Sequence, residues 1–556
     1  MSMSAESVKL LFIMPLFLSY GEALRRQEQP DGSVKTVPRV SLRGLPNGPL
    51  SIGTYIKKFF PGAEIKIFDA GTYLTELCGG NNEVPEDYGA FVRGSLRLFK
   101  DFKPDIIAFS CLFNGTFHGL REYAAAAAEM FPGALITAGG HLAAALPGKI
   151  LCDSSAVQAV CFGEGEIPFV KLCQAFTGGR VREYLEESVS WYTPGKIKSG
   201  FRASHEFIEN PDEIPPLDPE MLVYKEEFFR PNPYVFRYAE DNNREIMLFP
   251  TRGCPNHCIF CASQNVHGHR VRRNTAERVK KDILYYNEEY GVTCFVFFDD
   301  SFLYDRKSAI EVLNFIGDNG FTAIVPTPAF FAIDDEVAAA FAHARVACVE
   351  VSIENGNQET LTNIIHKPSN LKRAEQTIKC LRRHGIISMG TVLIGFPGET
   401  IASMMKGLAK LKTMDLDMFL VRIVTPLPGS ELWDICVKNG YFSGELMPFF
   451  QDAVIETPDF SREKITYLFY SYHKWLNFDF NRYYRAGKWK ESYDFFSHPI
   501  FSTSFLASYY LALCARKMGR EDLFLEHREN YLRERKEETQ GMPVYQRWAE
   551  RELREI

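Results

Sequence analysis

The sequence predicts an α/β protein: a doubly wound, Rossmann-like domain, then a partial (β/α)6 barrel of the TIM type, then a helical C-terminal extension. Two series of short apolar runs, each alternating with helical patterns, carry this prediction. A chain of 556 residues also exceeds one ordinary core, because domains average ~150 residues. We place the first domain at 1–175, a linker at 176–240, the barrel at 241–445 and the extension at 446–556.

The composition is that of an ordinary globular protein, with 46% apolar and 24% charged residues. The formal net charge of −7 offers no basic field, so we expect no nucleic-acid partner. Most of the thirteen cysteines outside one cluster lie in apolar runs. That usage indicates reduced thiols and predicts a cytoplasmic location.

The first strand is predicted in the apolar run from Leu10 to Leu18. This run is too short to cross a membrane and is broken by Pro15, so we expect no membrane association. A signal peptide is the competing interpretation, but no small-residue cleavage site follows the run. A helical pattern and a second strand follow instead, as an α/β unit requires.

Five buried strands are predicted in the first domain, because each is an apolar run without polar alternation. They begin at Val8, Glu64, Asp105, Ala134 and Val157. Glycines and polar residues gather where the last three strands end: Ser110, Asn114, Gly139, Gly140, His141, Gly163 and Glu164. Glycines also serve tight turns, but three equivalent strand ends favour a ligand site, since doubly wound sheets bind ligands there.

Six strands alternate with helices in the second series. They begin at Ile246, Cys294, Thr322, Ala347, Ser388 and Met418. One helix is predicted to begin at Asn274, with Glu277 completing a capping box, and another to end at Gly385. Barrels of this type work at the C-terminal ends of their strands.

The stretch CPNHCIFC follows the first strand of this series and places Cys254, Cys258 and Cys261 at the working rim. Three thiolates and a histidine (His257, His267 or His269) could close a zinc site. Three thiolates alone could hold an iron–sulfur cluster that leaves one iron open. Composition does not decide between the two metals, although a structural zinc site has no need of the barrel mouth.

The three cysteines, with Phe260 before the last, resemble the cluster motif of the radical S-adenosylmethionine (SAM) superfamily. Segments that follow later strands of the series resemble further parts of the same superfamily, in the same order along the chain. The resemblance implies SAM contacts from these strand ends, at Phe260, Asp299, Asp300, Ser352, Glu354, Ile394 and Gly395. It implies a [4Fe-4S] cluster on the three cysteines, with SAM on the fourth iron and His257 peripheral.

The first domain resembles the cobalamin-binding domain fused to one class of radical SAM enzymes. Asn47-Gly48-Pro49, the strand ending at Asp69, Gly139-Gly140-His141 and Gly163-Glu164 carry this resemblance. It implies that cobalamin contacts the strand-end residues Ser110, Asn114, Gly139, Gly140, His141, Gly163 and Glu164. Mutase-type domains carry D-x-H-x-x-G, but the corresponding region, placed at residues 69–73, has no histidine, so no lower cobalt ligand is predicted.

Together the resemblances imply a cobalamin-dependent radical SAM enzyme, most simply a methyltransferase acting on an unactivated carbon or phosphorus centre through a 5′-deoxyadenosyl radical and methylcobalamin. Its partners would be a small-molecule or peptide substrate and an electron donor of the flavodoxin or ferredoxin type. A radical SAM enzyme catalysing a non-methylating cyclisation or rearrangement, with or without cobalamin, is the first alternative. A zinc-stabilised binding protein is the second.

Two further segments leave alternatives open. The aromatic residues of the extension, among them Trp475, Phe478 and Tyr484, are expected to form the core of a helical domain rather than cover the active site. The basic run from His269 to Arg273 would either meet an anionic ligand or form a solvated loop.

Overall fold

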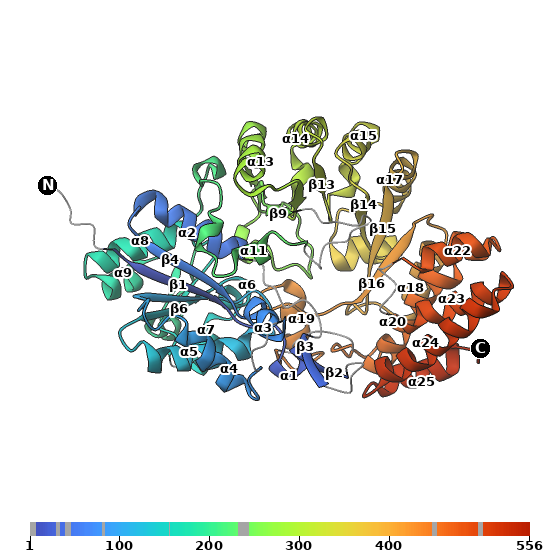
Figure 1. Cartoon of the computed structure of the whole chain (residues 1–556), viewed down its shortest axis with the longest axis horizontal. Helices are drawn as coiled ribbons and strands as arrows, with labels where there is room; N and C mark the ends of the chain where they lie inside the picture. Colours follow the sequence, from blue (N-terminus) through green and yellow to red (C-terminus); the bar gives the residue numbers. More distant parts are fainter. Residues whose placement is uncertain are drawn as a thin grey trace.

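The computed structural model describes residues 7–28, 34–38, 46–79, 84–154, 156–231, 244–446, 453–498 and 504–555. Figure 1 shows three parts along the longest axis: the N-terminal α/β domain, a curved barrel segment that arches over the middle, and a C-terminal group of helices at the opposite end. The order of domains predicted from the sequence is therefore the observed one.

The N-terminal domain contains a six-stranded sheet in the order β4-β1-β5-β6-β7-β8. All neighbours are parallel except β7 and β8, which are antiparallel. The strands are β1 (Lys9–Met14), β4 (Glu64–Asp69), β5 (Ile106–Ser110), β6 (Leu135–Gly139), β7 (Ala159–Cys161) and β8 (Trp191–Tyr192). The predicted apolar run at the N-terminus thus forms a central strand, between β4 and β5, where the strand order reverses.

Helices cover both faces of this sheet. The helices α2 (Asn47–Phe59) and α8 (Glu166–Thr177) share one core with one face, whereas α3, α4 and α5 pack on the other. The remaining bounds are α1 (Tyr20–Ala23), α3 (Ala70–Gly79), α4 (Tyr88–Arg97), α5 (Thr116–Met130), α6 (His141–Ala145), α7 (Pro147–Asp153), α9 (Val181–Glu187) and α10 (Pro194–Lys198).

Two features of this domain differ from the sequence prediction. The predicted linker, beginning at residue 176, supplies α9 and the edge strand β8, because Trp191 is fully buried against the sheet. A hairpin of β2 (Leu24–Glu28) and β3 (Val34–Pro38) also follows β1. Neither strand is an apolar run, so the sequence pattern does not reveal the hairpin.

The barrel consists of two parallel three-stranded sheets, β9-β12-β13 and β14-β15-β16. The strands are β9 (Glu245–Leu248), β12 (Cys294–Phe297), β13 (Thr322–Ile324), β14 (Cys348–Glu354), β15 (Ile387–Ile394) and β16 (Met418–Ile423). The backbone N–H of Glu350 in β14 reaches the carbonyl of Pro326 just past β13 at 2.9 Å, without a regular ladder. The six predicted strands therefore form a split, partial barrel.

Helices cover the outer face of the barrel, as Figure 1 shows for α13 to α17 along the arch. The bounds are α11 (Lys225–Phe228), α12 (Gln264–His267), α13 (Ala276–Tyr290), α14 (Arg306–Asp318), α15 (Asp335–His343), α16 (Gln358–Thr360), α17 (Leu371–Arg383), α18 (Ile401–Leu411) and α19 (Glu431–Lys438). A small ribbon pairs β10 (Thr251–Arg252) with β11 (Arg272–Arg273).

The predicted cap of α13 is wrong by one residue. Thr275, not Asn274, is the N-cap, and its side chain accepts from the N–H of Arg278. The Asn274 amide instead donates to Asp212 at 2.9 Å, which holds the start of this helix against the segment before the barrel. A tertiary contact therefore decides between two residues that both cap well.

The C-terminal part is helical, as predicted. Its helices are α20 (Arg462–Lys474), α21 (Arg482–Arg485), α22 (Trp489–Phe496), α23 (Phe505–Lys517), α24 (Glu521–Thr539) and α25 (Pro543–Glu552). Phe478 is fully buried and Tyr484 packs against the same aromatic core, so these aromatic residues form a core as expected. Asn477 fixes this part to β16, because its side chain bonds both the N–H (2.7 Å) and the carbonyl (2.9 Å) of Phe419.

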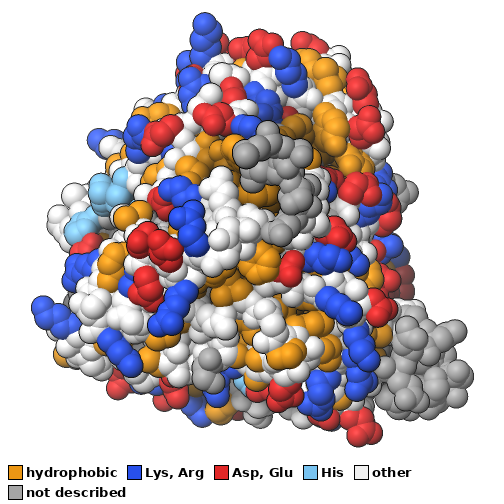
Figure 2. Space-filling view, turned by 90° about the vertical axis from the view of Figure 1, so that its left-hand side faces the viewer, with side chains coloured by type: hydrophobic (Ala, Val, Ile, Leu, Met, Phe, Trp, Pro, Cys, Tyr) orange, Lys and Arg blue, Asp and Glu red, His pale blue; other side chains and the backbone are white. Residues whose placement is uncertain are grey.

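No helix among the described residues is long and apolar enough to cross a membrane. On the face of the molecule in Figure 2, acidic and basic side chains are interspersed rather than gathered by sign. On this face the distribution agrees with the small net charge.

Candidate active site between the two α/β domains

A cavity of about 640 Å³ lies between the N-terminal sheet and the barrel. Its walls combine strand ends of the first domain, such as Ser110 and Gly139, with turns of the barrel, such as Thr251 and Asp299. Pockets for small molecules and cofactors are commonly ~300–1,000 Å³, so this volume suits one. Two strand-end regions predicted separately from the sequence therefore share one space.

The residues predicted to contact cobalamin line this cavity, with the exception of Asn114, which is outside the lining. Those that line it are Ser110, Gly139, Gly140, His141, Gly163 and Glu164. Gly140 has a φ of +94°, and a Cβ there would lie 2.7 Å from the carbonyl oxygen of Cys111. Only glycine fits this turn. Burial lowers the pKa of His141 to about 4, so its imidazole is neutral.

The cavity offers room for a large organic group beside the backbone. Gly48, at the start of α2, lines it, and a Cβ added there would meet no protein atom within 4 Å. The lining is mainly apolar, with Phe12, Phe109 and Phe169 among its residues. An apolar cavity with glycines at its rim fits an extended cofactor such as cobalamin, which can approach the backbone closely.

Glu164 joins the two domains through an ion-pair network, called the interdomain clamp here: Glu164, Glu166, Arg252, His267 and Arg272. The Arg272 guanidinium donates to both Glu164 oxygens, at 2.6 and 2.9 Å. Arg252 donates at 3.2 Å and the His267 ring lies 2.8 Å away. Burial opposes ionisation of Glu164, but these partners outweigh it and hold the pKa of its carboxyl well below the usual range.

Arg252 extends the clamp to a second carboxylate. It donates to Glu166 at 2.8 Å and to the hydroxyl of Ser51 at 2.9 Å. Because Arg252 lies two residues before Cys254, the clamp connects the rim of the first domain to the start of the cysteine turn. No local motif reveals this role, because Arg252 and Arg272 pair with carboxylates that are distant in the sequence.

The basic run therefore follows neither expected alternative as a whole. Arg272 is 4% exposed, pairs with Glu164 and lies 3.9 Å from the ring centre of Phe207. Arg270 pairs with Glu209, and Arg273 with Asp305. Its arginines serve contacts within the protein.

The three cluster cysteines lie in the turn after β9 and β10, half-buried. Burial raises the pKa of the Cys258 thiol to about 11, and the nearby Lys367 opposes this shift. Burial likewise raises the pKa of Cys261. A bound cation would offset this cost of deprotonation, because metal ligation favours the thiolate.

The cysteine turn shows no preformed three-ligand zinc site among the described residues. Ligand atoms around a tetrahedral zinc lie about 3.8 Å or less from one another. Within the described ranges, no three of the cluster cysteines and nearby histidines bring their ligand atoms within 4.8 Å of one another. His257 stacks on His269 with ring centres 4.1 Å apart, and His267 belongs to the clamp.

Asp299 and Asp300 follow β12 and face the large cavity. Asp299 is 5% exposed and accepts from the N–H of Thr251 at 3.1 Å and from its hydroxyl. Its Oδ1 finds no partner among the described residues, and burial raises its pKa to about 7. Asp300 accepts from Ser263 in the cysteine turn. A buried carboxyl group without a cation suits a ligand that brings one.

Ser352 and Glu354 end β14, outside the lining of the large cavity. Glu354 has a left-handed backbone conformation, with a φ of +64°. Its carboxylate pairs with Lys367 at 2.5 Å. Lys367 also acts electrostatically on Cys258 and Cys261, which places a cation beside the cysteine turn. The position of Lys367 beside the cysteines could not be predicted, because the loop that carries it belongs to no recognised motif.

Ile394 and Gly395 lie where β15 ends. Glu399 holds this turn, because it accepts from the N–H groups of Gly395 (3.1 Å) and Phe396 (3.0 Å) and from Asn355 (2.8 Å). Phe260 lies 6.1 Å from Phe396 between ring centres. The predicted SAM residues thus lie at or just after the C-terminal ends of four barrel strands: β9, β12, β14 and β15.

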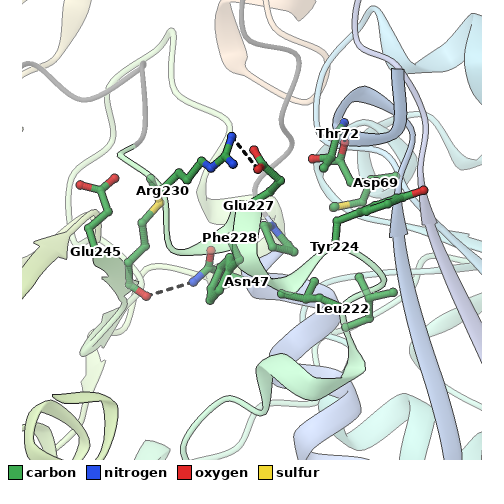
Figure 3. A pocket seen from close by; sticks show the side chains of 13 residues that line it. Asn47, Asp69, Thr72, Leu222, Tyr224, Glu227, Phe228, Arg230 and Glu245 are labelled. Atoms are coloured by element: carbon green, nitrogen blue, oxygen red, sulfur yellow. Dashed lines mark hydrogen bonds and ion pairs between the residues drawn. The ribbon is translucent and has the colours of Figure 1, made fainter. Parts of the chain in front are cut away.

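The region predicted to correspond to the mutase cobalt-ligand motif faces a separate, smaller pocket. Figure 3 shows this pocket, where Asp69 and Thr72 lie near Tyr224, and Asn47 reaches the carbonyl of Met247. Its volume is about 50 Å³, too small for a cofactor. The Asp69 carboxylate accepts from the N–H of Thr72 at 2.6 Å at the start of α3. Asp69 and Thr72 are outside the lining of the large cavity, whereas Asn47 and Met247 line both pockets.

Comparison with known protein families identifies both domains. Residues 248–410 match the model of the radical SAM superfamily, and residues 80–173 match the model of the B12 binding domain. The first match begins at the end of β9 and ends within α18, so it contains the cysteine turn and the mouth of the barrel. The second covers all seven strand-end residues predicted to contact cobalamin: Ser110, Asn114, Gly139, Gly140, His141, Gly163 and Glu164.

Similar proteins agree with these matches. A cytidylyl-2-hydroxyethylphosphonate methyltransferase of Streptomyces wedmorensis is 26% identical over 428 residues, which cover 71% of this chain and 79% of the relative. An uncharacterized methyltransferase of Pyrococcus horikoshii is 26% identical over 347 residues, covering 62% and 72%. The structure of the cobalamin-dependent SAM radical enzyme OxsB superposes with a TM-score of 0.61 at 13% identity, covering 98% of this chain and 84% of that one.

The protein is a radical SAM enzyme with an N-terminal B12-binding domain. Both resemblances seen in the sequence are thereby confirmed, and the zinc-stabilised binding protein is excluded as a description of the chain. The likeness to OxsB extends over nearly the whole chain and shows that the arrangement of domains is one already known in this fold.

Proposed function

We propose that the protein is a cobalamin-dependent radical SAM methyltransferase whose substrate binds between the N-terminal sheet and the barrel. The observation that carries this proposal is the shared cavity, which the strand ends of the B12-binding domain and the acidic turn after β12 line together. When bound, the cofactors supply a hydrogen-abstracting radical and a transferable methyl group. The methyltransferase names of both relatives support transfer of a methyl group over cyclisation.

The chain's own residues would divide the work by position. Cys254, Cys258 and Cys261 would hold the cluster, and Asp299 would pair with the ammonium group of SAM. That ammonium would return the pKa of Asp299 toward its ordinary value, because an opposite charge favours the carboxylate. Glu399 would keep the turn after β15 in shape for the adenine.

The B12-binding side would act mainly through its backbone. Gly139, Gly140 and Gly163 would let cobalamin approach the strand ends, and Ser110 and His141 would donate or accept hydrogen bonds at the same rim. The interdomain clamp would fix this rim relative to the cysteine turn. Fixed geometry matters, because a displacement of about 1 Å between reacting groups can cost ~100-fold in rate.

Anaerobic incubation of reconstituted protein with SAM, a strong reductant and hydroxocobalamin tests the reaction. With a substrate present, we expect both 5′-deoxyadenosine and S-adenosylhomocysteine. The product should be heavier than the substrate by one CH2. Deoxyadenosine without S-adenosylhomocysteine would instead support the non-methylating alternative. Neither product from protein with a full cluster would overturn the proposal.

A matched pair of glycine variants tests the cobalamin site. Gly48 and Gly94 both lie in helices with no protein atom within 4 Å of an added Cβ, but only Gly48 lines the cavity. We expect Gly48→Leu to lower cobalamin occupancy at least tenfold, because its side chain would occupy the cavity. Gly94→Leu should bind as the wild type does. Equal binding by both variants would place cobalamin elsewhere.

A further inference from the structure

The two faces of β16 have different surroundings. Phe419 and Val421 point into the core beneath the barrel helices, whereas Met418 and Leu420 pack against the aromatic core of the C-terminal helices. Alternate residues of a strand point to opposite faces, so Arg422 shares the inner face of Met418 and Leu420. Arg422 is therefore the last inward side chain before the strand ends at Ile423.

A polar layer lies above an apolar plug on this inner face. Cys348 of β14 and Met389 of β15 join the C-terminal core and close the bottom of the barrel. Two residues further along the same strands stand Glu350 and Thr391, and the Thr391 hydroxyl donates to the Glu350 carboxyl group. Arg422 pairs with Leu393 of β15 and so lies one inward position beyond Thr391, toward the mouth of the barrel.

The backbone of Arg422 pairs with β15, but its side chain makes no ion pair or hydrogen bond with any residue in the described part of the chain. Its side chain is exposed, yet the surrounding protein lowers the pKa of its guanidinium, with Glu350 opposing. The guanidinium is therefore open to solvent on the inner face of the strand. The contrast with Arg252 and Arg272 is plain, since both have carboxylate partners.

His473 adds a neutral donor near Arg422. The Asn477 oxygen accepts from the N–H of Phe419, which fixes its amide nitrogen toward the Nδ1 of His473, 3.1 Å away. That Nδ1 must accept, so the proton of the neutral ring is on Nε2. Burial, with Arg422 nearby, lowers the pKa of His473 to about 4 and keeps the ring neutral.

Arg422 is distinct from the cation beside the cluster. Lys367 pairs with Glu354 and acts on Cys258 and Cys261. Arg422 instead interacts electrostatically with Glu350 and His473. Lys367 and Arg422 therefore belong to two different sets of charges.

We propose that Arg422, with the Glu350–Thr391 pair and His473 around it, is an anchoring subsite for an anionic group of the substrate, either a phosphate, a phosphonate or a carboxylate. This inference rests on the proposed function, because it assumes that the substrate enters the barrel mouth. The planar guanidinium suits such groups, since it donates two parallel hydrogen bonds to them. The substrate class is then an anionic small molecule rather than a neutral one.

Binding of inorganic phosphate, methylphosphonate and acetate to the reconstituted holoenzyme tests the subsite, followed by ³¹P line broadening or, for acetate, ¹H saturation transfer. We expect Arg422→Gln to weaken binding of at least one probe tenfold or more. Arg422→Lys, which keeps the charge but loses the planar fork, should fall between this variant and the wild type. The matched control is Arg533→Gln on α24, an exposed arginine remote from the barrel, which should bind as the wild type does.

SAM affinity and deoxyadenosine formation without substrate distinguish the remaining outcomes. We expect both to stay within twofold of wild type in Arg422→Gln, with an unchanged cluster absorbance and melting temperature. A tenfold loss of SAM affinity without loss of probe binding would assign Arg422 to the cofactor and overturn the subsite. Equal probe binding in all variants would also overturn it.

The subsite and the proposed function fail separately. Wild-type protein that cleaves SAM but binds none of the three probes would retain the function and lose the subsite. Protein that binds a probe through Arg422 but forms neither product of SAM would keep an anion site and lose the methyltransferase proposal, and with it the assignment of the anion to a methyl acceptor.

Discussion

The two walls of the shared cavity treat their buried carboxyl groups in opposite ways. On the N-terminal side Glu164, 4% exposed, is surrounded by two arginines and a histidine, and its pKa is held well below the usual range. On the barrel side Asp299, 5% exposed, has only Thr251 as a partner, and burial raises its pKa to about 7.

Equal burial therefore has different meanings. A carboxylate whose cations come from the protein is part of the structure, and removing it leaves buried charges unpaired. A carboxyl group without such cations is ready for a cation from a ligand, and a perturbed pKa in a cavity is a mark of such sites. The interdomain clamp thus fixes how the two domains lie against each other, whereas Asp299 at the barrel mouth is free to pair with a cation of the cofactor.

The largest effect is expected from breaking the barrel side at the cluster. Cys258→Ala should lower deoxyadenosine formation more than ~1,000-fold, because three thiolates are needed to hold the cluster at an open iron. Iron and sulfide content, with the visible absorbance, measure the loss directly. Cys152→Ala, an exposed cysteine on α7, is the control and should retain both cluster and activity. A full cluster in Cys258→Ala would assign its ligands to other cysteines.

Breaking the clamp should cost mainly stability. Glu164→Ala leaves Arg252 and Arg272 buried without their shared partner, which we expect to reduce the free energy of unfolding by about 3–5 kcal/mol. Urea denaturation measures it, and a double-mutant cycle with Arg272→Ala should show strong coupling. Glu64→Ala, whose pair with Lys9 is at the surface, should cost under about 1 kcal/mol. A similar small loss for Glu164→Ala would mean that the domains pack without the clamp.

Asp299 should respond to pH in the opposite sense to a salt-bridged carboxylate. Its folded-state pKa, about 7, is above the unfolded value of about 4, so the folded protein binds the extra proton between these limits. Its contribution to stability is complete below pH 4 and is lost as pH rises through 7. Without cofactor, wild type should therefore lose stability relative to Asp299→Asn between pH 4 and pH 8.

The same substitution should weaken SAM. Asp299→Asn removes the charge for the ammonium group, and we expect about a 10- to 100-fold loss of affinity at pH 8 by equilibrium dialysis. The loss should shrink at pH 6, where the wild-type group is protonated without ligand. Asp318→Asn, exposed on α14, serves as control for both measurements. No pH-dependent difference from wild type would show that Asp299 does not titrate in this range.

The smallest effect is expected at Glu399, a second buried carboxyl group of the barrel that can be compared with Asp299. It is fully buried and burial raises its pKa to about 7, as for Asp299, but three hydrogen bonds from the protein occupy its oxygens. Glu399→Gln should cost about 1–2 kcal/mol of stability and change SAM affinity less than fivefold. Thermal denaturation and dialysis measure these effects, with the exposed Glu359→Gln as control. A larger loss of SAM affinity than in Asp299→Asn would reverse the two roles.

Much of the fold could be predicted from the sequence, because buried parallel strands are apolar throughout and short. The central β1, the six barrel strands and the helical C-terminal part follow from this pattern. The edge strand β8 does not, since two residues of strand carry no pattern. The cap of α13 at Thr275 likewise depends on Asp212, which lies far away in sequence.

The site divides in the same way. The cysteine turn and the glycine strand ends are local motifs, and their residue types and spacing are sufficient to identify them. Lys367, Arg422 and the partners of Glu164 belong to no motif. Their roles depend on which charges meet across the barrel or across the domain boundary, and charge pairs of this kind join residues up to 108 positions apart.

The sequence by itself determined the class of enzyme and the order of domains, because each is encoded within a few consecutive residues or in a repeating hydrophobic pattern. Only the tertiary structure decided that the two strand-end regions share one cavity, that Glu164 is consumed by the clamp while Asp299 lacks a cation, and that Arg422 faces the barrel interior. The physical reason is that desolvation and charge pairing depend on neighbours in space, which the chain brings together only on folding.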